Sequence, residues 1–393
     1  MELVNKKIAL LKSKVKNNEP ITVMIIGLGS VGTFLLDFLV SLRDPQMKIV
    51  VAGRNAAKMQ MDVNIVRTAA TIRRELRSSI EIMDGCDLND VDSIAATIKK
   101  ANPDFIVNSS RVYSGLKYGS ISWSSLRAYG IWSPLSIRYA KNIMAAYAKA
   151  GSNAITINTS YSDAVIPWLK SAGKAYFDFG SGNLNHLIPR MKFYMAEKYG
   201  IDNLNDIDVT LAVSHFHDVV ISKEGHAEGQ ALLLNFKHNG KELAFNQDEL
   251  LKACAIAMPV DQKRNMMNAS SNFNIIDSIL TALRENTTTK IHAPGVDGEI
   301  GGYPVLIDGV KGEASFDTSL FSMDDMRAAN RKSIYCDGIE NVENGTLVYT
   351  DELVVKVKKA FNVDLPKRVA FDEIETVADF IIKNIIEPFA PKK

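Results

Sequence analysis

The stretch ITVMIIGLGSVGTFLLDFLVSL, residues 21–42, contains the strongest structural signal in the chain. Residues 21–26 form a continuous apolar run, which is typical of a buried parallel strand. Gly27, Gly29 and Gly32 follow with the spacing G-x-G-x-x-G, and apolar residues at helical spacing continue from there to residue 39. A strand, a glycine turn and a helix in this order predict the first unit of a doubly wound parallel sheet.

The glycine turn predicts a binding site for the pyrophosphate of a dinucleotide. Gly27 permits the tight turn, Gly29 lets the backbone approach the phosphates, and Gly32 lets the helix pack closely on the strand. The N-terminus of the predicted helix, which begins with Ser30 and Val31, would face the phosphates. We therefore expect an N-terminal dinucleotide-binding domain of the Rossmann type.

The end of the second predicted strand, KIVVAG at residues 48–53, bears on the choice of cofactor. An Asp or Glu at this point would bond the ribose 2′-hydroxyl of NAD, whereas an arginine can pair with the 2′-phosphate of NADP. The sequence here reads Gly53-Arg54-Asn55, so we expect NADP(H) in preference to NAD(H). A solvent-facing Arg54 is the alternative. Asp87, after a third predicted strand, could line the adenine pocket or cap the following helix.

Two further predicted strands end in polar residues. One ends at Asn108 and Ser109, with Arg111 in its exit loop, and the other ends at Asn158. In an open parallel sheet, ligands bind outside the carboxyl ends of the strands. These residues are therefore expected at the nicotinamide end of the dinucleotide.

The composition excludes several classes of protein. The 393 residues include 46 Lys and Arg against 45 Asp and Glu, so the charge predicts no nucleic-acid or membrane partner. The three cysteines lie far apart in sequence, so neither a disulfide framework nor a zinc ribbon is indicated. No apolar run approaches the ~20 residues of a membrane span. We expect a cytoplasmic enzyme acting on a small molecule, with a short amphipathic helix over residues 1–18.

The later part of the chain resembles the lactate/malate dehydrogenase superfamily in the order of its motifs. INTSYSDAVIPWL (157–169) precedes DFGSGNLNHLIPRMKFYMAEKYGID (178–202), and LAVSHFHD (211–218) falls where that family carries its catalytic histidine. The segments at 268–283, 301–313 and 322–342 resemble its later helix, hairpin and final helix. The Gly-Arg-Asn end of the second strand also resembles NADP enzymes of the saccharopine-reductase type.

This resemblance implies a two-domain α/β oxidoreductase that transfers a hydride between the dinucleotide and a small carbonyl or imine compound. We expect the Rossmann domain over residues 1–170, a mixed α+β substrate domain over 171–345, and a helical extension over 346–393. In that extension Val377, Ile381 and Ile385 form an apolar stripe. A homodimer or higher homo-oligomer is expected.

Two histidines are the first candidates for proton transfer. His215 and His217 alternate in the apolar run 211–220, which predicts a strand with both side chains on one face and Asp218 on the other. Imidazole suits a proton donor to a carbonyl or imine. The resemblance places His215 at the catalytic position, so we expect one histidine to be catalytic and one structural. His186 is a further candidate.

Several positions depart from the family pattern. Asn185 stands where the family has the aspartate that pairs with its histidine, and the family's substrate-binding arginine falls on Ile188, with Arg190 nearby. Arg111 and Arg127 lie in the interval of the family's mobile loop. We therefore expect a substrate other than pyruvate or oxaloacetate, bearing a carboxylate if Arg111, Arg127 or Arg190 reaches the cleft.

Two other functions fit parts of the sequence. The departures also suit a non-catalytic dinucleotide-binding sensor. His-x-His, with Glu224, His226 and Glu228 close by, could bind a metal, and NAD- and manganese-dependent glycosidases share this fold. Because their metal is held by Cys and His and no cysteine lies near these histidines in sequence, we expect no metal.

Overall fold

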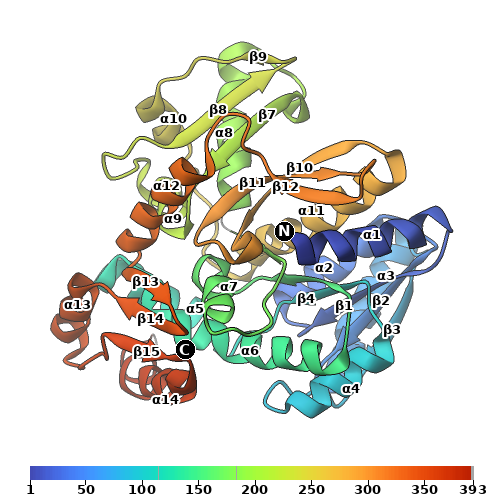
Figure 1. The fold of residues 1–393 in the computed structure, drawn as a ribbon, viewed down its shortest axis with the longest axis horizontal. Coiled ribbons are helices and arrows are strands. Elements are labelled where there is room, and N and C mark those ends of the chain that lie inside the picture. Colours follow the sequence, from blue (N-terminus) through green and yellow to red (C-terminus); the bar gives the residue numbers. More distant parts are fainter. Residues whose placement is uncertain (114, 183, 391–393) are drawn as a thin grey trace.

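The computed structural model describes residues 1–113, 115–182 and 184–390 (Figure 1). Its centre is a six-stranded parallel sheet with the order β3-β2-β1-β4-β5-β6. The strands are β1 (Ile21–Ile26), β2 (Met47–Ala52), β3 (Ser79–Met83), β4 (Phe105–Asn108), β5 (Ile155–Asn158) and β6 (Phe179–Gly180). This strand order is that of the dinucleotide-binding doubly wound fold, so the predicted fold class is confirmed.

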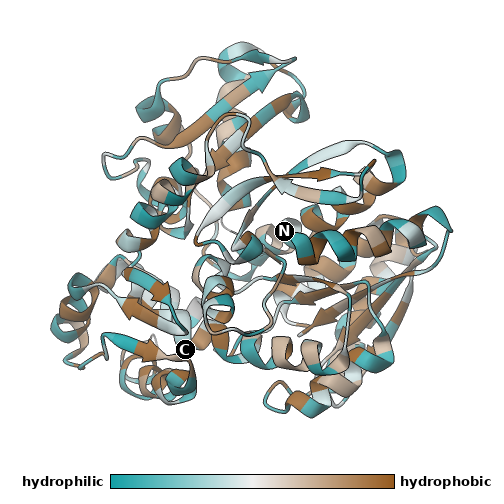
Figure 2. Ribbon diagram, in the orientation of Figure 1, coloured by the Kyte–Doolittle hydropathy of each residue, from teal (hydrophilic) through white to brown (hydrophobic). Residues whose placement is uncertain are grey.

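Helices cover both faces of this sheet. They are α1 (Glu2–Lys16), α2 (Ser30–Ser41), α3 (Ala56–Ile72), α4 (Val91–Ala101), α5 (Gly115–Ile121), α6 (Ser133–Ala150) and α7 (Ser162–Ser171). Every residue of β1 is buried, and Figure 2 shows the central strands as predominantly hydrophobic. The predicted N-terminal helix is present, and α1 buries Val4, Ile8 and Leu11.

The segment after β6 forms a smaller antiparallel sheet, β7-β8-β9, with helices around it. Its elements are α8 (Leu184–Tyr199), β7 (Ile207–Ala212), α9 (His215–Glu224), β8 (Leu233–His238), β9 (Lys241–Glu242) and α10 (Gln247–Ala253). Asn239 and Gly240, with φ of 51° and 74°, make the tight hairpin turn between β8 and β9 that favours an Asn-Gly pair.

A second antiparallel sheet, β10-β11-β12, connects this segment back to the parallel sheet. Its elements are α11 (Asn265–Glu285), β10 (Thr288–Pro294), β11 (Gly302–Asp308), β12 (Glu313–Phe316) and α12 (Met323–Cys336). The long helix α11 packs against α2 of the Rossmann unit, and both helices contribute to one hydrophobic cluster with β1. The N-terminus of α11 is thereby held beside the glycine turn.

The C-terminal part is more than the helical extension that the sequence predicts. It contains β13 (Ile339–Glu343), β14 (Thr346–Tyr349), α13 (Asp351–Phe361), β15 (Arg368–Ala370), α14 (Ile374–Ile381) and α15 (Glu387–Phe389). The apolar stripe of Val377, Ile381 and Ile385 is buried as expected. β14 pairs with both β13 and β15 in a three-stranded sheet. The sequence did not predict β14 and β15, because strands of four and three residues carry too little periodicity to be recognised.

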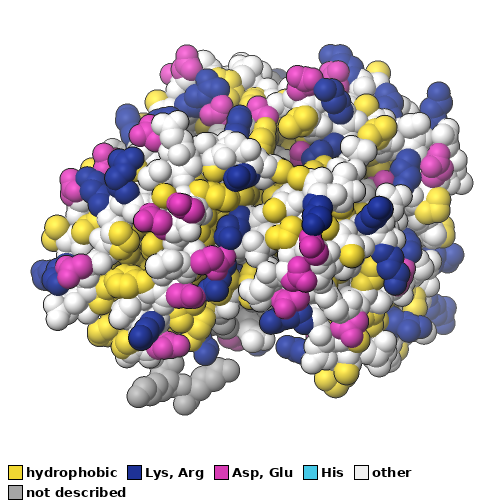
Figure 3. Space-filling model, turned by 60° about the horizontal axis from the view of Figure 1, so that its bottom comes forward, with side chains coloured by type: hydrophobic (Ala, Val, Ile, Leu, Met, Phe, Trp, Pro, Cys, Tyr) yellow, Lys and Arg dark blue, Asp and Glu magenta, His cyan; other side chains and the backbone are white. Residues whose placement is uncertain are grey.

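The hydrophobic cores cross the predicted segment boundaries. One cluster joins Trp132 and Trp168 of the Rossmann unit with Tyr349 and Ile381 of the C-terminal part. The division at residues 170 and 345 and the homo-oligomeric state stay predictions. On the face drawn in Figure 3, Lys and Arg side chains are interspersed with Asp and Glu side chains. Within the described ranges, no helix combines the length and apolar character needed to cross a membrane.

Candidate active site at the carboxyl edge of the sheet

The glycine turn has the geometry that a dinucleotide needs. Gly27 adopts a φ of 90°, and a Cβ on Gly32 would lie 2.4 Å from the carbonyl oxygen of Gly27. Around Gly29, in contrast, a Cβ would meet nothing within 4 Å, so this position faces open space. Gly29 caps α2 without a side-chain hydrogen bond, which leaves the first-turn N–H groups of Ser30 and Val31 free for phosphate oxygens. These residues fit a bound dinucleotide.

The residues at the end of β2 have different local roles. Asn55 caps α3 by accepting a hydrogen bond from the N–H of Lys58 at 2.9 Å. Arg54 is mostly exposed, and its Nη1 lies 4.0 Å from Oδ1 of Asp87. Gly53 leaves room for Met59, whose sulfur would be 2.9 Å from an added Cβ. Asp87 and Arg54 therefore lie close together beside β2.

The helix after Asp87 is capped by another residue. Asp90 accepts the N–H of Asp92 at the start of α4, whereas Asp87 accepts the N–H of Asn89. Asp90, and not Asp87, is therefore the N-cap of α4.

Two buried amides join the ends of β4 and β5. Asn108 donates to Oδ1 of Asn158 at 2.9 Å, and Asn158 donates to Oγ of Ser162 at 3.0 Å. Ser109 donates to the carbonyl oxygen of Gly27 at 2.6 Å. These three sequence-predicted residues thus hold the glycine turn, the two strand ends and the start of α7 in one polar network.

The segment 211–220 is not the strand that the sequence predicts. β7 ends at Ala212, Ser214 is extended, and α9 begins at His215. Residues two apart on a helix differ by about 200° in direction, so His215 and His217 do not share a face. The prediction failed because the same run also has apolar residues at helical spacing, with Phe216, Val220 and Ile221 buried.

His215 is held by two carboxylates from distant parts of the chain. Its Nδ1 lies 2.8 Å from Oδ2 of Asp337, and its backbone N–H donates to Oδ1 of Asp163 at 3.0 Å. Asp337 is completely buried and also accepts the hydroxyl of Tyr161 and the N–H of Tyr129, each at 2.7 Å. A proton on Nδ1 therefore points to Asp337, which leaves Nε2 for a reacting group.

The electrostatics of this cluster favour a charged imidazole. Burial alone would lower the pKa of His215, but the charge and hydrogen bond of Asp337 outweigh it, and the pKa is raised. Burial raises the pKa of Asp163 to about 6, although the nearby His215 opposes the change. His215 keeps 11% of its side chain exposed, and no described residue bonds its Nε2. Nε2 is thus the ring nitrogen of His215 that stays available to a ligand.

His217 has the environment of a packed histidine. Its Nδ1 lies 2.6 Å from Oγ of Ser333, and its Nε2 is buried without a partner among the described residues. Burial lowers its pKa. A buried, neutral imidazole on the far side of α9 does not suit proton transfer to a ligand at His215.

The three candidate site residues on α8 have different surroundings. Asn185 donates to Oγ of Ser271 at 2.9 Å, so it does not orient His215. Arg190 is buried and donates to the carbonyl oxygen of Cys254 at 2.8 Å. It anchors the loop after α10 rather than a ligand. Burial lowers the pKa of His186 to about 3, so this imidazole is neutral.

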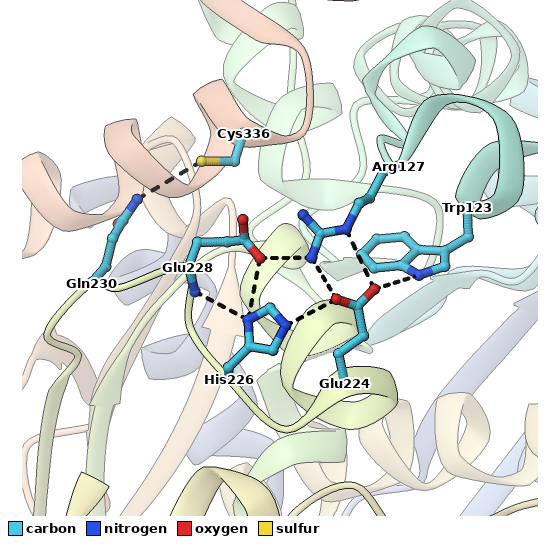
Figure 4. Close-up of polar contacts among 7 residues, drawn as sticks. All are labelled: Trp123, Arg127, Glu224, His226, Glu228, Gln230 and Cys336. Carbon is cyan, nitrogen blue, oxygen red and sulfur yellow. Dashed lines mark hydrogen bonds and ion pairs between the residues drawn. The ribbon is translucent and has the colours of Figure 1, made fainter. Parts of the chain in front are cut away.

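Arg127 points toward Glu224 and Glu228 in a cluster of polar contacts (Figure 4). Its guanidinium pairs with Oε2 of Glu224 at 2.5 Å and with Oε1 of Glu228 at 2.6 Å. The two carboxylates also flank His226, whose ring nitrogens lie 3.0 and 3.2 Å from them. This exposed cluster has the residues for a metal, with ligand atoms within 4.8 Å of one another, but Arg127 already neutralises both carboxylates. Arg111 is exposed and precedes α5, whereas Arg127 follows the helical turn after α5.

Sequence reasoning missed Arg264, which directly precedes α11. The next residue, Asn265, donates to Oγ of Ser30 in the glycine turn at 2.6 Å. The charge of Arg264 opposes the burial-driven rise in the pKa of Asp218, which still reaches about 7. With burial, it also lowers the pKa of His186. Arg264 is therefore next in sequence to a residue that contacts the glycine turn, and its charge acts on Asp218 and His186.

The side chain of Arg264 has no hydrogen-bond or ion-pair partner among the residues that the structure describes, whereas its backbone N–H donates to the carbonyl oxygen of Asp261 at 3.2 Å. The buried side-chain atoms without a partner in the same described ranges all lie on α8 or at α9: His186 Nε2, Arg190 Nε, Ser214 Oγ and His217 Nε2. A group of unsatisfied polar atoms is a sign of a ligand or water position. The sequence carried no signal for Arg264 beyond a single basic residue before a helix.

No protein-family model matches the chain, and a search of curated proteins finds no match. Solved structures do resemble it. Cryptosporidium parvum malate dehydrogenase is 12% identical, with a TM-score of 0.52 over 80% of this chain and 96% of that one. C. parvum lactate dehydrogenase is 13% identical, with a TM-score of 0.53 over 95% and 99%. Plasmodium falciparum malate dehydrogenase is 13% identical, with a TM-score of 0.51 over 87% and 99%.

These likenesses define the fold in two steps. The strand order and glycine turn place the chain among the doubly wound dinucleotide-binding folds. Within them, it has the fold of the lactate and malate dehydrogenases in a divergent form, as the sequence resemblance predicted. At 12–13% identity the likeness concerns the fold, and the activity has to be argued from the site.

Proposed function

We propose that the protein is a nicotinamide-dinucleotide-dependent oxidoreductase in which His215 donates or accepts the proton. The observation that carries this proposal is the buried His215–Asp337 pair, at 2.8 Å, beside the carboxyl edge of a sheet with a dinucleotide turn. The similar P. falciparum malate dehydrogenase is in complex with NADH, and the similar C. parvum lactate dehydrogenase is in complex with lactic acid and β-nicotinamide adenine dinucleotide. Both support the same class of cofactor here.

The chain's own residues account for the proton. A bound nicotinamide supplies or takes up the hydride. In reduction, His215 gives the proton on Nε2 to the carbonyl oxygen or imine nitrogen of the substrate and becomes neutral, and solvent protonates it again. Asp337 stabilises the charged imidazole and fixes its orientation. The hydroxyl of Tyr161 and the backbone N–H of Tyr129 donate hydrogen bonds that fix the position of the Asp337 side chain.

Arg264 supports a substrate with an acidic group. Its charge acts on His186 and Asp218, and its side chain has no partner among the described residues, whereas Arg127 and Arg190 are engaged elsewhere. We infer that the guanidinium of Arg264 pairs with the substrate carboxylate and aligns the carbonyl or imine toward His215. A carboxylate partner for the histidine and a free cation together favour an enzyme over a non-catalytic sensor.

We propose NADP(H) as the preferred cofactor because of Arg54, which follows β2 and is mostly exposed. Arg54→Ala should weaken NADPH binding about tenfold and leave NADH binding nearly unchanged, since the lost pair involves only the 2′-phosphate. Arg67→Ala, an exposed arginine further along α3, is the matched control. Titration of each dinucleotide by fluorescence measures both affinities. An equal loss for NADH and NADPH, or tighter NADH binding to the unchanged protein, contradicts this preference.

The main test is turnover with a panel of oxo acids, imino acids and aldehydes, followed by NADPH absorbance. His215→Asn should lower kcat by about 10²–10⁴, because general acid catalysis is lost while the side chain can still bond Asp337. His238→Asn, on β8, is the control and should behave like the unchanged protein. The proposal fails if the chain binds neither dinucleotide, or if His215→Asn turns over as fast as the control.

A further inference from the structure

A cavity of about 360 Å³ shares no lining residue with the glycine turn or with the contacts of His215. It is lined by residues from the last turn of α7, the segment 298–300 and one face of α12. Its size falls in the range of about 300–1,000 Å³ that small-molecule sites have. Nothing in the proposed reaction uses this cavity, so its chemistry needs an explanation of its own.

The cavity carries an excess of positive charge. Lys170, Arg327 and Arg331 line it, against one carboxylate, Glu299. Arg327 pairs with Glu299, with oxygen-to-nitrogen distances of 2.7 and 3.1 Å, and with Asp324 at 3.3 Å. Arg331 follows Arg327 by one helical turn, and its side chain has no hydrogen bond or ion pair within the part of the chain described. Lys170 and Arg331 are therefore lining cations without a carboxylate partner among the described residues, which favours an anionic ligand.

The remaining donors suit a phosphate group. Lys170 uses one N–H for the carbonyl oxygen of Asp297 at 2.5 Å and has two more to offer. The guanidinium of Arg331 presents a planar fork that matches two phosphate oxygens. Pro167 and Ile300 give the cavity an apolar wall beside these donors. We propose that the cavity binds a small phosphorylated molecule whose organic part packs on that wall.

Two helices, α7 and α12, link the lining of this cavity with the His215 cluster. α7 carries Lys170 in its last turn and, in its first turn, Asp163, which accepts the N–H of His215. α12 carries Arg331, and Asp337 follows directly after its end. At 1.5 Å per residue, each path is about 10 Å long. A phosphate that attracts Lys170 and Arg331 therefore pulls on α7 and α12. These two helices position the carboxylates that contact His215.

We infer that occupancy of the cavity regulates turnover through these helices. The inferred effect on turnover rests on the proposed function, whereas the inferred binding of a phosphorylated molecule does not. The binding test therefore comes first and requires no substrate. NADPH is present throughout, so that a phosphate group cannot occupy the glycine turn.

Isothermal titration with phenyl phosphate at constant ionic strength measures the binding. The unchanged chain should bind it saturably and more tightly than inorganic phosphate, since only phenyl phosphate reaches the apolar wall. Arg331→Ala should weaken binding at least tenfold. Lys332→Ala, which removes a neighbouring exposed charge of α12, should stay within twofold. Absence of saturable binding, or equal losses in both variants, overturns the site.

Turnover with and without saturating phenyl phosphate measures the regulation. We expect at least a twofold change in kcat or KM that Arg331→Ala loses, while its basal turnover stays unchanged. Saturable binding without any change in turnover overturns the inferred regulation. A chain that binds phenyl phosphate through Arg331 but binds no dinucleotide contradicts the proposed function and leaves the cavity site standing.

Discussion

The glycine turn and the His215 cluster lie near the same edge of the sheet, but they are built in different ways. The turn comes from one contiguous segment, residues 21–41, in which strand, turn and helix follow each other directly. The cluster joins His215 of α9 with Asp163 of α7, Asp337 after α12 and Tyr129 before α6. His215 and Asp337 are 122 positions apart.

This difference explains why the sequence predicts the glycine turn but not the partners of His215. A local motif constrains its own backbone, so its glycines and apolar run can be interpreted together. An assembled site has no spacing rule, because tertiary packing alone brings its members together. Asp337-Gly338 is typical of an ordinary turn in sequence, and Gly338 indeed has a φ of 90°. The same aspartate is the buried partner of His215.

The largest expected effect tests the assembled site. Asp337→Asn should lower kcat by about 10²–10⁴, as the loss of a histidine's carboxylate does elsewhere. Asp337 raises the pKa of His215, so its loss should lower that pKa. Because reduction needs protonated His215, the high-pH limb of the rate profile should move to lower pH. The measurement is kcat and kcat/KM against pH.

A second change distinguishes this arrangement from the family pattern. Asn185→Asp restores the aspartate of the resembling family at its usual position. It should not rescue Asp337→Asn, because the Asn185 side chain is directed to Ser271. Recovery of turnover in the double variant would show that the chain uses the family's arrangement after all.

An intermediate effect is expected for Arg264. Arg264→Ala should raise KM for an acidic substrate about 10–100-fold with a smaller change in kcat, because a charge-assisted pair is lost. Lys263→Ala, the adjacent exposed cation, should leave both constants nearly unchanged. Steady-state kinetics with the best substrate of the panel measure the split. A similar rise in KM for both variants would indicate general attraction rather than a defined pair.

The smallest effects test the local turn. Gly29→Ala should weaken dinucleotide binding about tenfold without a measurable loss of stability, since a Cβ there meets only open space. Gly32→Ala should lower the free energy of unfolding by about 1–3 kcal/mol, because its Cβ would press on Gly27. Urea unfolding and dinucleotide titration of both variants measure the contrast. Equal stability losses would contradict separate roles for the two glycines.

Much of the fold could be predicted from the sequence. The parallel strands, the helix over residues 1–18, the Asn-Gly hairpin and the tail helices each follow from local periodicity or turn chemistry. The strand expected at 211–220 was wrong, because its apolar residues satisfy helical as well as strand spacing. The short strands β14 and β15 were missed, because they exist only by pairing with β13 and with each other.

The sequence by itself determined the dinucleotide turn and the dehydrogenase-like fold, because contiguous residues impose that backbone. The tertiary structure decided which groups surround His215. Asp337 and Arg264 enter the site only when α12 and α11 pack beside α9 and α2. Charges in a buried cluster act through space rather than along the chain, and Asp337 therefore provides the carboxylate that Asn185 does not.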